Sequence, residues 1–90
     1  MIRSFRNKAL RELFETGRSA KVPSELRRRV TERLDALHAA LTLADLNRPG
    51  LHCHPLKGAS RYAISVNGPW RITFAWVAPD AFLVDLEQYH

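Results

Sequence analysis

The first apolar cluster of the chain has the spacing of an amphipathic helix. Four side chains fall on one side of a helix over residues 7–16, namely Ala9, Leu10, Leu13 and Phe14. Gly17 follows directly and is placed to end this helix in a left-handed conformation, which glycine adopts at little cost. We therefore expect a short N-terminal helix that packs one face against the rest of the protein.

A second apolar stripe predicts a longer helix from about residue 23 to about residue 40. Its members recur every three or four residues: Leu26, Val30, Leu34, Leu37 and Leu41. Pro23 suits the first turn of such a helix, because the N–H that proline lacks would have no partner there. His38 flanks the stripe, and we interpret it as a structural residue. Residues 42–50, which end in Asn-Arg-Pro-Gly, predict a loop.

From Leu51 onward the period changes to two, which predicts β-strands. Apolar and smaller or polar side chains alternate over residues 62–66, 70–76 and 82–86. Each strand would have an apolar face for the helices and a more polar opposite face. We expect an α+β fold, in which two N-terminal helices pack on a twisted, mainly antiparallel sheet within a single domain of residues 1–90.

The register of the first strand pair follows from the rule that directly opposed residues share a face of the sheet. An odd-numbered loop around residues 67–69 would pair Val66 with Trp70. The same register places Ser65 beside Arg71, on the polar face.

The last hairpin is expected to pair Trp76 with Phe82 across five loop residues, 77–81. Arg71 would then lie opposite Glu87. The polar face would be shared by Arg61, Ser65, Arg71, Thr73, Asp85 and Glu87.

The net charge of +5 is unevenly distributed. Residues 1–40 hold ten Lys and Arg against five Asp and Glu, whereas residues 41–90 hold four of each. Such a basic half suits an anionic polymer such as RNA. A solvated helix surface explains the same charge equally well, so charge alone leaves both readings open.

Other features of the composition exclude several classes of protein. One cysteine rules out an internal disulfide framework, and one cysteine with four histidines matches no structural zinc pattern. The chain has no apolar run near 18 residues and no signal-peptide-like segment. We therefore expect a soluble cytoplasmic protein with no membrane contact.

The C-terminal half contains the residue types that cleave RNA without a metal. Imidazoles can act as base and acid, cations can hold a phosphate, and an aromatic ring can stack on a base. The candidates are His54, Lys57, Arg71, Tyr89 and His90, with Arg61 and Ser65 as further members of the polar face. We expect no cofactor and no metal, because a His52, His54 and His90 set without an acidic companion is a weak metal site.

Each candidate also has a simpler explanation. His54 could be a surface imidazole bonded to backbone, and Cys53 beside it is most simply a small core residue. Arg71 could form a cross-strand ion pair with Glu87, which would also orient its guanidinium for a phosphate. Tyr89 and His90 end the chain, where residues usually fray.

Several segments together resemble the HigB-type toxins of the RelE/ParE superfamily, over essentially the whole chain. In the helical half they are Ile2-Arg3-Ser4-Phe5, Lys8, Leu10, Leu13, Phe14-Glu15, Gly17, Arg33-Leu34, Leu37 and Ala40. In the remainder they are Asp45-Leu46-Asn47-Arg48-Pro49-Gly50, Leu56-Lys57-Gly58, Val66-Asn67-Gly68, Trp70-Arg71-Ile72-Thr73-Phe74, Asp80-Ala81 and Tyr89-His90.

This resemblance implies a toxin of a type II toxin–antitoxin system with the RelE-like fold. It implies a metal-independent endoribonuclease that cuts mRNA on the ribosome and so inhibits translation. The implied partners are a helix-turn-helix antitoxin of the HigA type, the ribosome and mRNA, with operator DNA reached only through the antitoxin. Carried over by position, the catalytic residues would be His54, Lys57, Arg71, Tyr89 and His90. Apart from the resemblance, we expect Arg61, Ser65, Glu87 and Gln88 to contact the substrate.

The chain departs from the family at one position of its C-terminal motif. The family often ends in Asp-Tyr-His, whereas this chain has Gln88 before Tyr89. Glutamine cannot take a proton as a carboxylate can. Two alternatives therefore stay open from sequence, namely a non-catalytic toxin of the same fold that inhibits DNA gyrase, and a basic RNA- or protein-binding module.

Overall fold

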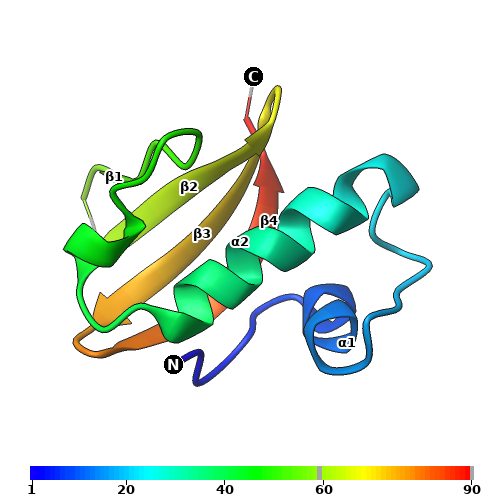
Figure 1. The fold of residues 1–90 in the computed structure, drawn as a ribbon, viewed down its shortest axis with the longest axis horizontal. Helices are drawn as coiled ribbons and strands as arrows, with labels where there is room; N and C mark the ends of the chain where they lie inside the picture. Colours follow the sequence, from blue (N-terminus) through cyan, green and yellow to red (C-terminus); the bar gives the residue numbers. More distant parts are fainter. Residues whose placement is uncertain (59, 90) are drawn as a thin grey trace.

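The computed structural model describes residues 1–58 and 60–89, in which one long helix lies across one face of a four-stranded antiparallel sheet and a shorter helix lies beside it (Figure 1). The helices are α1 (Lys8–Thr16) and α2 (Arg27–Ala39), with two 3-10 turns, η1 (Ser24–Leu26) and η2 (Leu43–Leu46). The strands follow in sheet order as β1 (His54–Pro55), β2 (Arg61–Asn67), β3 (Trp70–Val77) and β4 (Asp80–Gln88). The predicted α+β fold is confirmed. Neither helix of the described chain is both long and apolar enough to span a membrane.

The ends of α1 are fixed by local hydrogen bonds. The Asn7 side chain accepts the N–H of Leu10 at 3.1 Å, which satisfies a donor of the first helical turn. Gly17 has a φ of 78°, and its N–H donates to the Leu13 carbonyl at 2.8 Å. Glycine tolerates this left-handed conformation, so the predicted cap is confirmed.

The second helix starts later than its apolar stripe suggests. Pro23 has extended backbone and lies outside the helix, and the Leu26 N–H bonds the Pro23 carbonyl at 2.9 Å. This tight three-residue turn precedes α2, so the expectation that Pro23 occupies its first turn is wrong. The loop expected after α2 also contains a 3-10 turn, because Thr42 and Asp45 cap η2 reciprocally.

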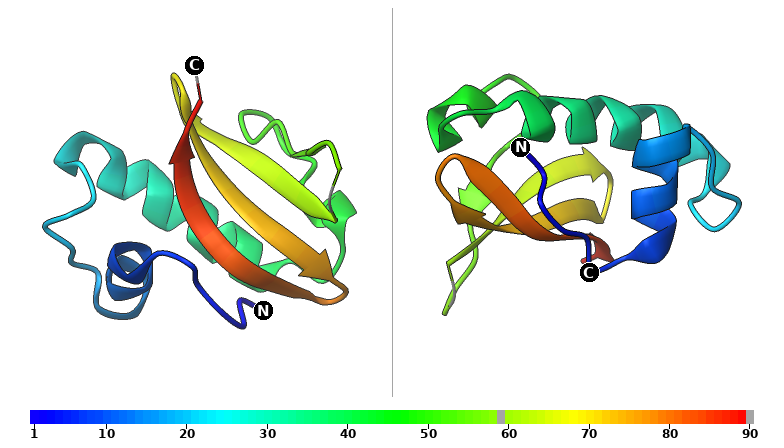
Figure 2. Two further views of the ribbon diagram at one scale, coloured as in Figure 1. Left: turned by 180° about the vertical axis from the view of Figure 1, so that it is seen from behind. Right: turned by 90° about the horizontal axis from the view of Figure 1, so that it is seen from below.

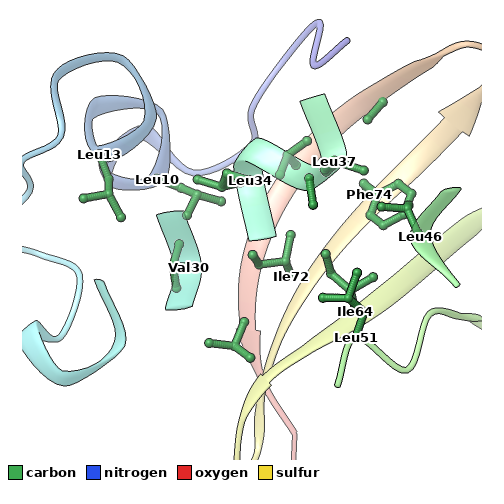
Figure 3. Close-up of a cluster of buried hydrophobic side chains, with 14 of the residues drawn as sticks. Leu10, Leu13, Val30, Leu34, Leu37, Leu46, Leu51, Ile64, Ile72 and Phe74 are labelled. Atoms are coloured by element: carbon green, nitrogen blue, oxygen red, sulfur yellow. The ribbon is translucent and has the colours of Figure 1, made fainter. Parts of the chain in front are cut away.

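The core lies between α2 and the sheet (Figure 3). Leu34 and Leu37 of α2 meet Ile64, Ile72 and Phe74 from β2 and β3, and all five are fully buried. Burial of this apolar surface is the main stabilising term of the fold. The alternating strand residues that do not join this core face away from the helices.

The N-terminal segment covers the outer edge of β4. The Arg3 N–H donates to the Ala81 carbonyl at 2.8 Å, and the Arg6 N–H donates to the Val84 carbonyl at 2.9 Å. These bonds satisfy a strand edge that would otherwise be open to pairing with another chain. His38 helps to hold this segment, because its Nδ1 accepts the Ile2 N–H at 3.1 Å. His38 therefore has the structural role expected.

The β2–β3 register is confirmed in part. Ser65 lies opposite Arg71 as predicted, but Trp70 is opposite Asn67 instead of Val66. A bulge between Ser65 and Asn67 shifts the ladder by one residue. The extra residue, Val66, remains buried in the core.

A second bulge corrects the last hairpin. Arg71 lies opposite Glu87 as predicted, but Trp76 pairs with Ala81, so the expected Trp76–Phe82 pair is wrong. Leu83, at a φ of 54°, lies in the bulge that changes the register. As a result Ala81 is buried in the core. Phe82 is paired with Ala75, on the face of the sheet that points away from the helices.

The face of the sheet opposite α2 carries no helix, as Figure 2 shows from behind the view of Figure 1. We call it the open face. The register and the alternation of the strands assign to it Arg61, Ala63, Ser65, Arg71, Thr73, Ala75, Phe82, Asp85 and Glu87.

Candidate functional site

His54 reaches the open face through the short edge strand β1. It is the register partner of Ala63, which is in turn opposite Thr73 in β3. Since directly opposed residues share a face, the imidazole joins the open face. The chain itself gives no such placement, because Pro55 and the following turn interrupt the alternation.

The environment of His54 leaves one ring nitrogen available. The side chain is exposed, and Nδ1 lies 2.8 Å from the His52 carbonyl oxygen. An Nδ1–H donated to this oxygen leaves Nε2 unprotonated, so that Nε2 can accept a proton. In the neutral ring, this backbone contact thus favours the tautomer whose Nε2 is an acceptor.

Arg71 is anchored to the turn between β2 and β3. Its Nη1 donates to the Gly68 carbonyl at 2.7 Å and to the Trp70 carbonyl at 2.9 Å. Glu87, its register partner, forms its ion pair with Arg61 instead, at 3.8 Å. The alternative of an Arg71–Glu87 ion pair is therefore wrong, although the register behind it is right.

Tyr89 is fixed to the same turn. Its backbone N–H donates to the Pro69 carbonyl at 2.7 Å, and its side chain is 37% exposed. The turn between β2 and β3 therefore holds both Arg71 and Tyr89 at one end of the sheet. His90, the last of the expected catalytic residues, lies outside the described residues.

Lys57 lies in the turn that joins β1 to β2. The Leu56 N–H bonds the Arg61 carbonyl at 2.8 Å across the base of this turn. Gly58 has a φ of 78°, a backbone conformation that glycine readily supplies. The Lys57 side chain is exposed, so its ammonium is not committed to the core.

A hydrogen-bonded network crosses the open face between three strands. Thr73 accepts from Arg61 Nη2 at 2.8 Å, and its hydroxyl donates to the Glu87 carboxylate. Thr73, at the centre of this network, is fully buried, whereas the Arg61 and Glu87 side chains are partly exposed. Sequence alternation places Thr73 on this face but gives no reason to count it as a site residue.

Two other expected contacts differ in their placement. Ser65 lies on the open face opposite Arg71, and its carbonyl accepts from Arg33 Nε of α2 at 2.7 Å. Gln88 is opposite Trp70, which packs on the core side, so Gln88 is not brought to the open face.

Phe82 is an aromatic residue that the sequence places in the core. The bulge in β4 pairs it with Ala75, on the open face, and its side chain is half-buried. Strand alternation alone cannot reveal this placement, because the shift arises from a single residue at positive φ, Leu83.

Cys53 separates the two neighbouring histidines but is unsuited to nucleophilic chemistry. It is half-buried and packs against the core. Burial raises the pKa of the Cys53 thiol, which keeps it in the less nucleophilic protonated form. Within residues 1–58 and 60–89, no three His, Cys, Asp or Glu side chains gather as a metal site.

Two shallow cavities lie away from these residues. One, of about 260 Å³, is lined by Glu32, Arg33, Ala36, Arg48, Pro49 and Leu51. The other, of about 310 Å³, is lined by Lys8, Ala9, Glu12, Ser19, Ala20 and Lys21. Neither includes His54, Lys57, Arg71 or Tyr89. The candidate site is therefore a polar sheet surface, which suits an extended polymer better than a small enclosed ligand.

The sequence is also similar to those of known proteins. Residues 3–90 match the family model of the HigB-like toxins, described as the RelE-like toxin of the type II toxin–antitoxin system HigB. A Proteus vulgaris protein named Endoribonuclease HigB is 40% identical to this chain, over the full length of both. The family match covers nearly the whole sequence, and the α+β architecture is consistent with a RelE-like fold. The chain belongs to the HigB-like toxin family.

Proposed function

We propose that this toxin is an endoribonuclease that cleaves mRNA on the ribosome, without a metal, and so inhibits translation. The observation that carries the proposal is the placement of His54 on the same open face as Arg71 and Arg61. Cleavage of RNA by its own ribose 2′-hydroxyl needs a base to take the hydroxyl proton and cations to stabilise the charge on the phosphate. A proton acceptor and two guanidiniums on one polar surface supply these groups.

The proposed reaction is attack of the ribose 2′-oxygen on the adjacent phosphorus, with departure of the 5′-oxygen. One group of the set formed by His54, Tyr89 and His90 would take the 2′-hydroxyl proton, and another would protonate the leaving oxygen. Arg71 and Lys57 would hold the non-bridging phosphate oxygens as negative charge develops on them. Arg61 and Ser65 would extend these contacts along the strand.

The partners follow from family membership and from charge. A toxin of a type II system acts with an antitoxin, and we propose an antitoxin of the helix-turn-helix HigA type, through which operator DNA would be reached. Residues 1–40 hold ten basic and five acidic residues, and this positive net charge supports contact with ribosomal RNA. We place this action in the cytoplasm, where ribosomes and mRNA meet.

The decisive experiment measures mRNA cleavage with and without ribosomes for the wild type, His54→Ala and His90→Ala. Loss of a general acid or base costs about 100-fold to 10,000-fold, so each variant should lose most cleavage and growth arrest. His52→Asn is the matched control, because His52 is exposed and has a φ of 47°, which asparagine tolerates.

Three outcomes are informative. Full cleavage by the double variant His54→Ala with His90→Ala would show that neither imidazole acts as the acid or the base. Growth arrest with intact mRNA and accumulated DNA breaks would show a toxin directed at gyrase. Cleavage that persists in a metal chelator and requires ribosomes would support the reaction as proposed.

A further inference from the structure

Arg61, Thr73 and Glu87 form a closed set of contacts across β2, β3 and β4. Arg61 Nη2 bonds the Thr73 hydroxyl at 2.8 Å and lies 3.8 Å from the Glu87 carboxylate, to which Thr73 also donates. We propose that Thr73 and Glu87 are positioning residues that hold the Arg61 guanidinium for a phosphate of the RNA. This inference rests on the proposed ribonuclease function.

The burial of Thr73 fixes the direction of its hydrogen bonds to Arg61 and Glu87. Its side chain is fully buried, so water does not compete for the hydroxyl. The hydroxyl accepts from Arg61 and donates to Glu87, which uses its single proton and fixes its rotation. One edge of the guanidinium is therefore held in a defined orientation before any RNA binds.

The free donors of Arg61 argue for a role beyond stability. Its Nε is buried and has no partner within the described chain, an arrangement that disfavours the folded state. Nη1 likewise has no hydrogen bond to residues 1–58 or 60–89. A phosphate oxygen is an acceptor of the right charge for Nη1, because guanidinium and phosphate form strong charge-assisted hydrogen bonds.

The location of Arg61 agrees with such a contact. It lies two residues from Ala63, the register partner of His54, so its backbone is about 8 Å from that of His54 in a regular sheet. Glu87 is the register partner of Arg71 and lies on β4, beside β3, where its carboxylate reaches Arg61 of β2 across Thr73. Glu87 therefore supplies a carboxylate to the open face, which Gln88 on the opposite face cannot do.

The test compares single-turnover cleavage of ribosome-bound mRNA, at a saturating concentration of the ribosome–mRNA complex, for Thr73→Val, Thr73→Ser and Glu87→Gln. Thr73→Val keeps the shape but removes the hydroxyl, and it should slow cleavage about tenfold or more, as should Glu87→Gln. Thr73→Ser retains the hydroxyl and should recover most of the rate. Asp85→Asn is the matched control, because Asp85 is on the same face of β4 but contacts neither Arg61 nor Thr73 through a side-chain hydrogen bond.

A double-variant cycle separates positioning from a merely structural role. If Thr73 acts through Arg61, Thr73→Val should have no further effect on cleavage in an Arg61→Ala background. An equal loss with and without Arg61, or a lower Tm with an unchanged cleavage rate, would overturn the inference.

Binding provides a readout that does not depend on cleavage. Ribosome-bound mRNA with 2′-O-methyl groups lacks the attacking hydroxyl, so its affinity can be measured without cleavage. Thr73→Val should weaken this binding about tenfold, and equal binding by wild type and variant would contradict the positioning role. Wild type that binds this complex but never cuts the unmodified mRNA on the ribosome would instead contradict the proposed function.

Discussion

The Arg71 guanidinium donates to the Gly68 carbonyl at 2.7 Å, through the same Nη1 that also reaches the Trp70 carbonyl. The nitrogen at one end of the guanidinium is thus fixed to the β2–β3 turn. Nε and Nη2 take no part in these two bonds and are the donors that the proposed phosphate contact would use. The turn therefore orients the cation, while the strand supplies its position on the open face.

Replacement of Arg71 by lysine should preserve the charge but lose this orientation. A lysine has one ammonium and cannot bond the turn and a phosphate through separate nitrogens of a rigid group. We expect Arg71→Lys to lower kcat/KM for RNA cleavage about 10-fold to 100-fold, with little change in Tm. Arg48→Lys, an exposed change outside the site, should cleave RNA at the wild-type rate. An Arg71→Lys protein with wild-type kinetics would mean that charge alone is required.

The register shift in β4 has a direct consequence for stability. Phe74 is fully buried in the core, whereas Phe82 lies half-buried on the open face. Phe74→Ala should lower the free energy of unfolding by about 3–5 kcal/mol, and Phe82→Ala by about 1–2 kcal/mol. Urea denaturation of the two variants measures both values. Equal losses would place Phe82 in the core, as strand alternation alone predicts.

This hairpin also shows how far the sequence determines the fold. Alternation identifies the faces of β2, β3 and β4, because burying one face of a sheet requires it. It therefore predicts that Ser65 and Glu87 lie opposite Arg71, as they do. It cannot predict the two bulges, because each depends on a local backbone conformation, such as the positive φ of Leu83.

The candidate site is less predictable than the sheet that carries it. His54 reaches the open face only through pairing with Ala63, a tertiary contact of a two-residue strand. The Thr73 hydroxyl gains its role from side chains of two other strands, which no local pattern records. Residue types can indicate the chemistry, but the placement of each group depends on register.

Arg33 provides a test of the support behind the open face. Its Nε donates to the Ser65 carbonyl at 2.7 Å, and its side chain is only 15% exposed. Arg33→Met should lower the free energy of unfolding by about 1–3 kcal/mol, because a charge-assisted and partly buried hydrogen bond to the Ser65 carbonyl is lost. Arg29→Met, an exposed change on the same helix, should alter it by less than about 0.5 kcal/mol. Similar unfolding curves for both variants would show that the Arg33 bond contributes nothing measurable.

Asp45 gives the protein a pH-dependent component of stability. Its Oδ2 accepts the N–H groups of Leu41 at 2.8 Å and Thr42 at 3.1 Å, and these backbone bonds lower the pKa of the Asp45 carboxyl below its ordinary value. Between the folded and unfolded pKa values the unfolded chain binds more protons, so stability rises with pH in that window. The contribution is complete above the unfolded pKa, about 3.9, and is lost as pH falls through the folded pKa.

Asp45→Asn should therefore be less stable than the wild type at neutral pH and approach it in acid. Asparagine keeps an acceptor oxygen but lacks the charge that the two N–H groups stabilise. Urea midpoints measured for both proteins from pH 7 to about pH 2 give the difference in stability between wild type and variant as the Asp45 carboxyl becomes protonated. A difference that stays constant over this range would mean that the η2 cap depends on hydrogen bonding and not on the charge of Asp45.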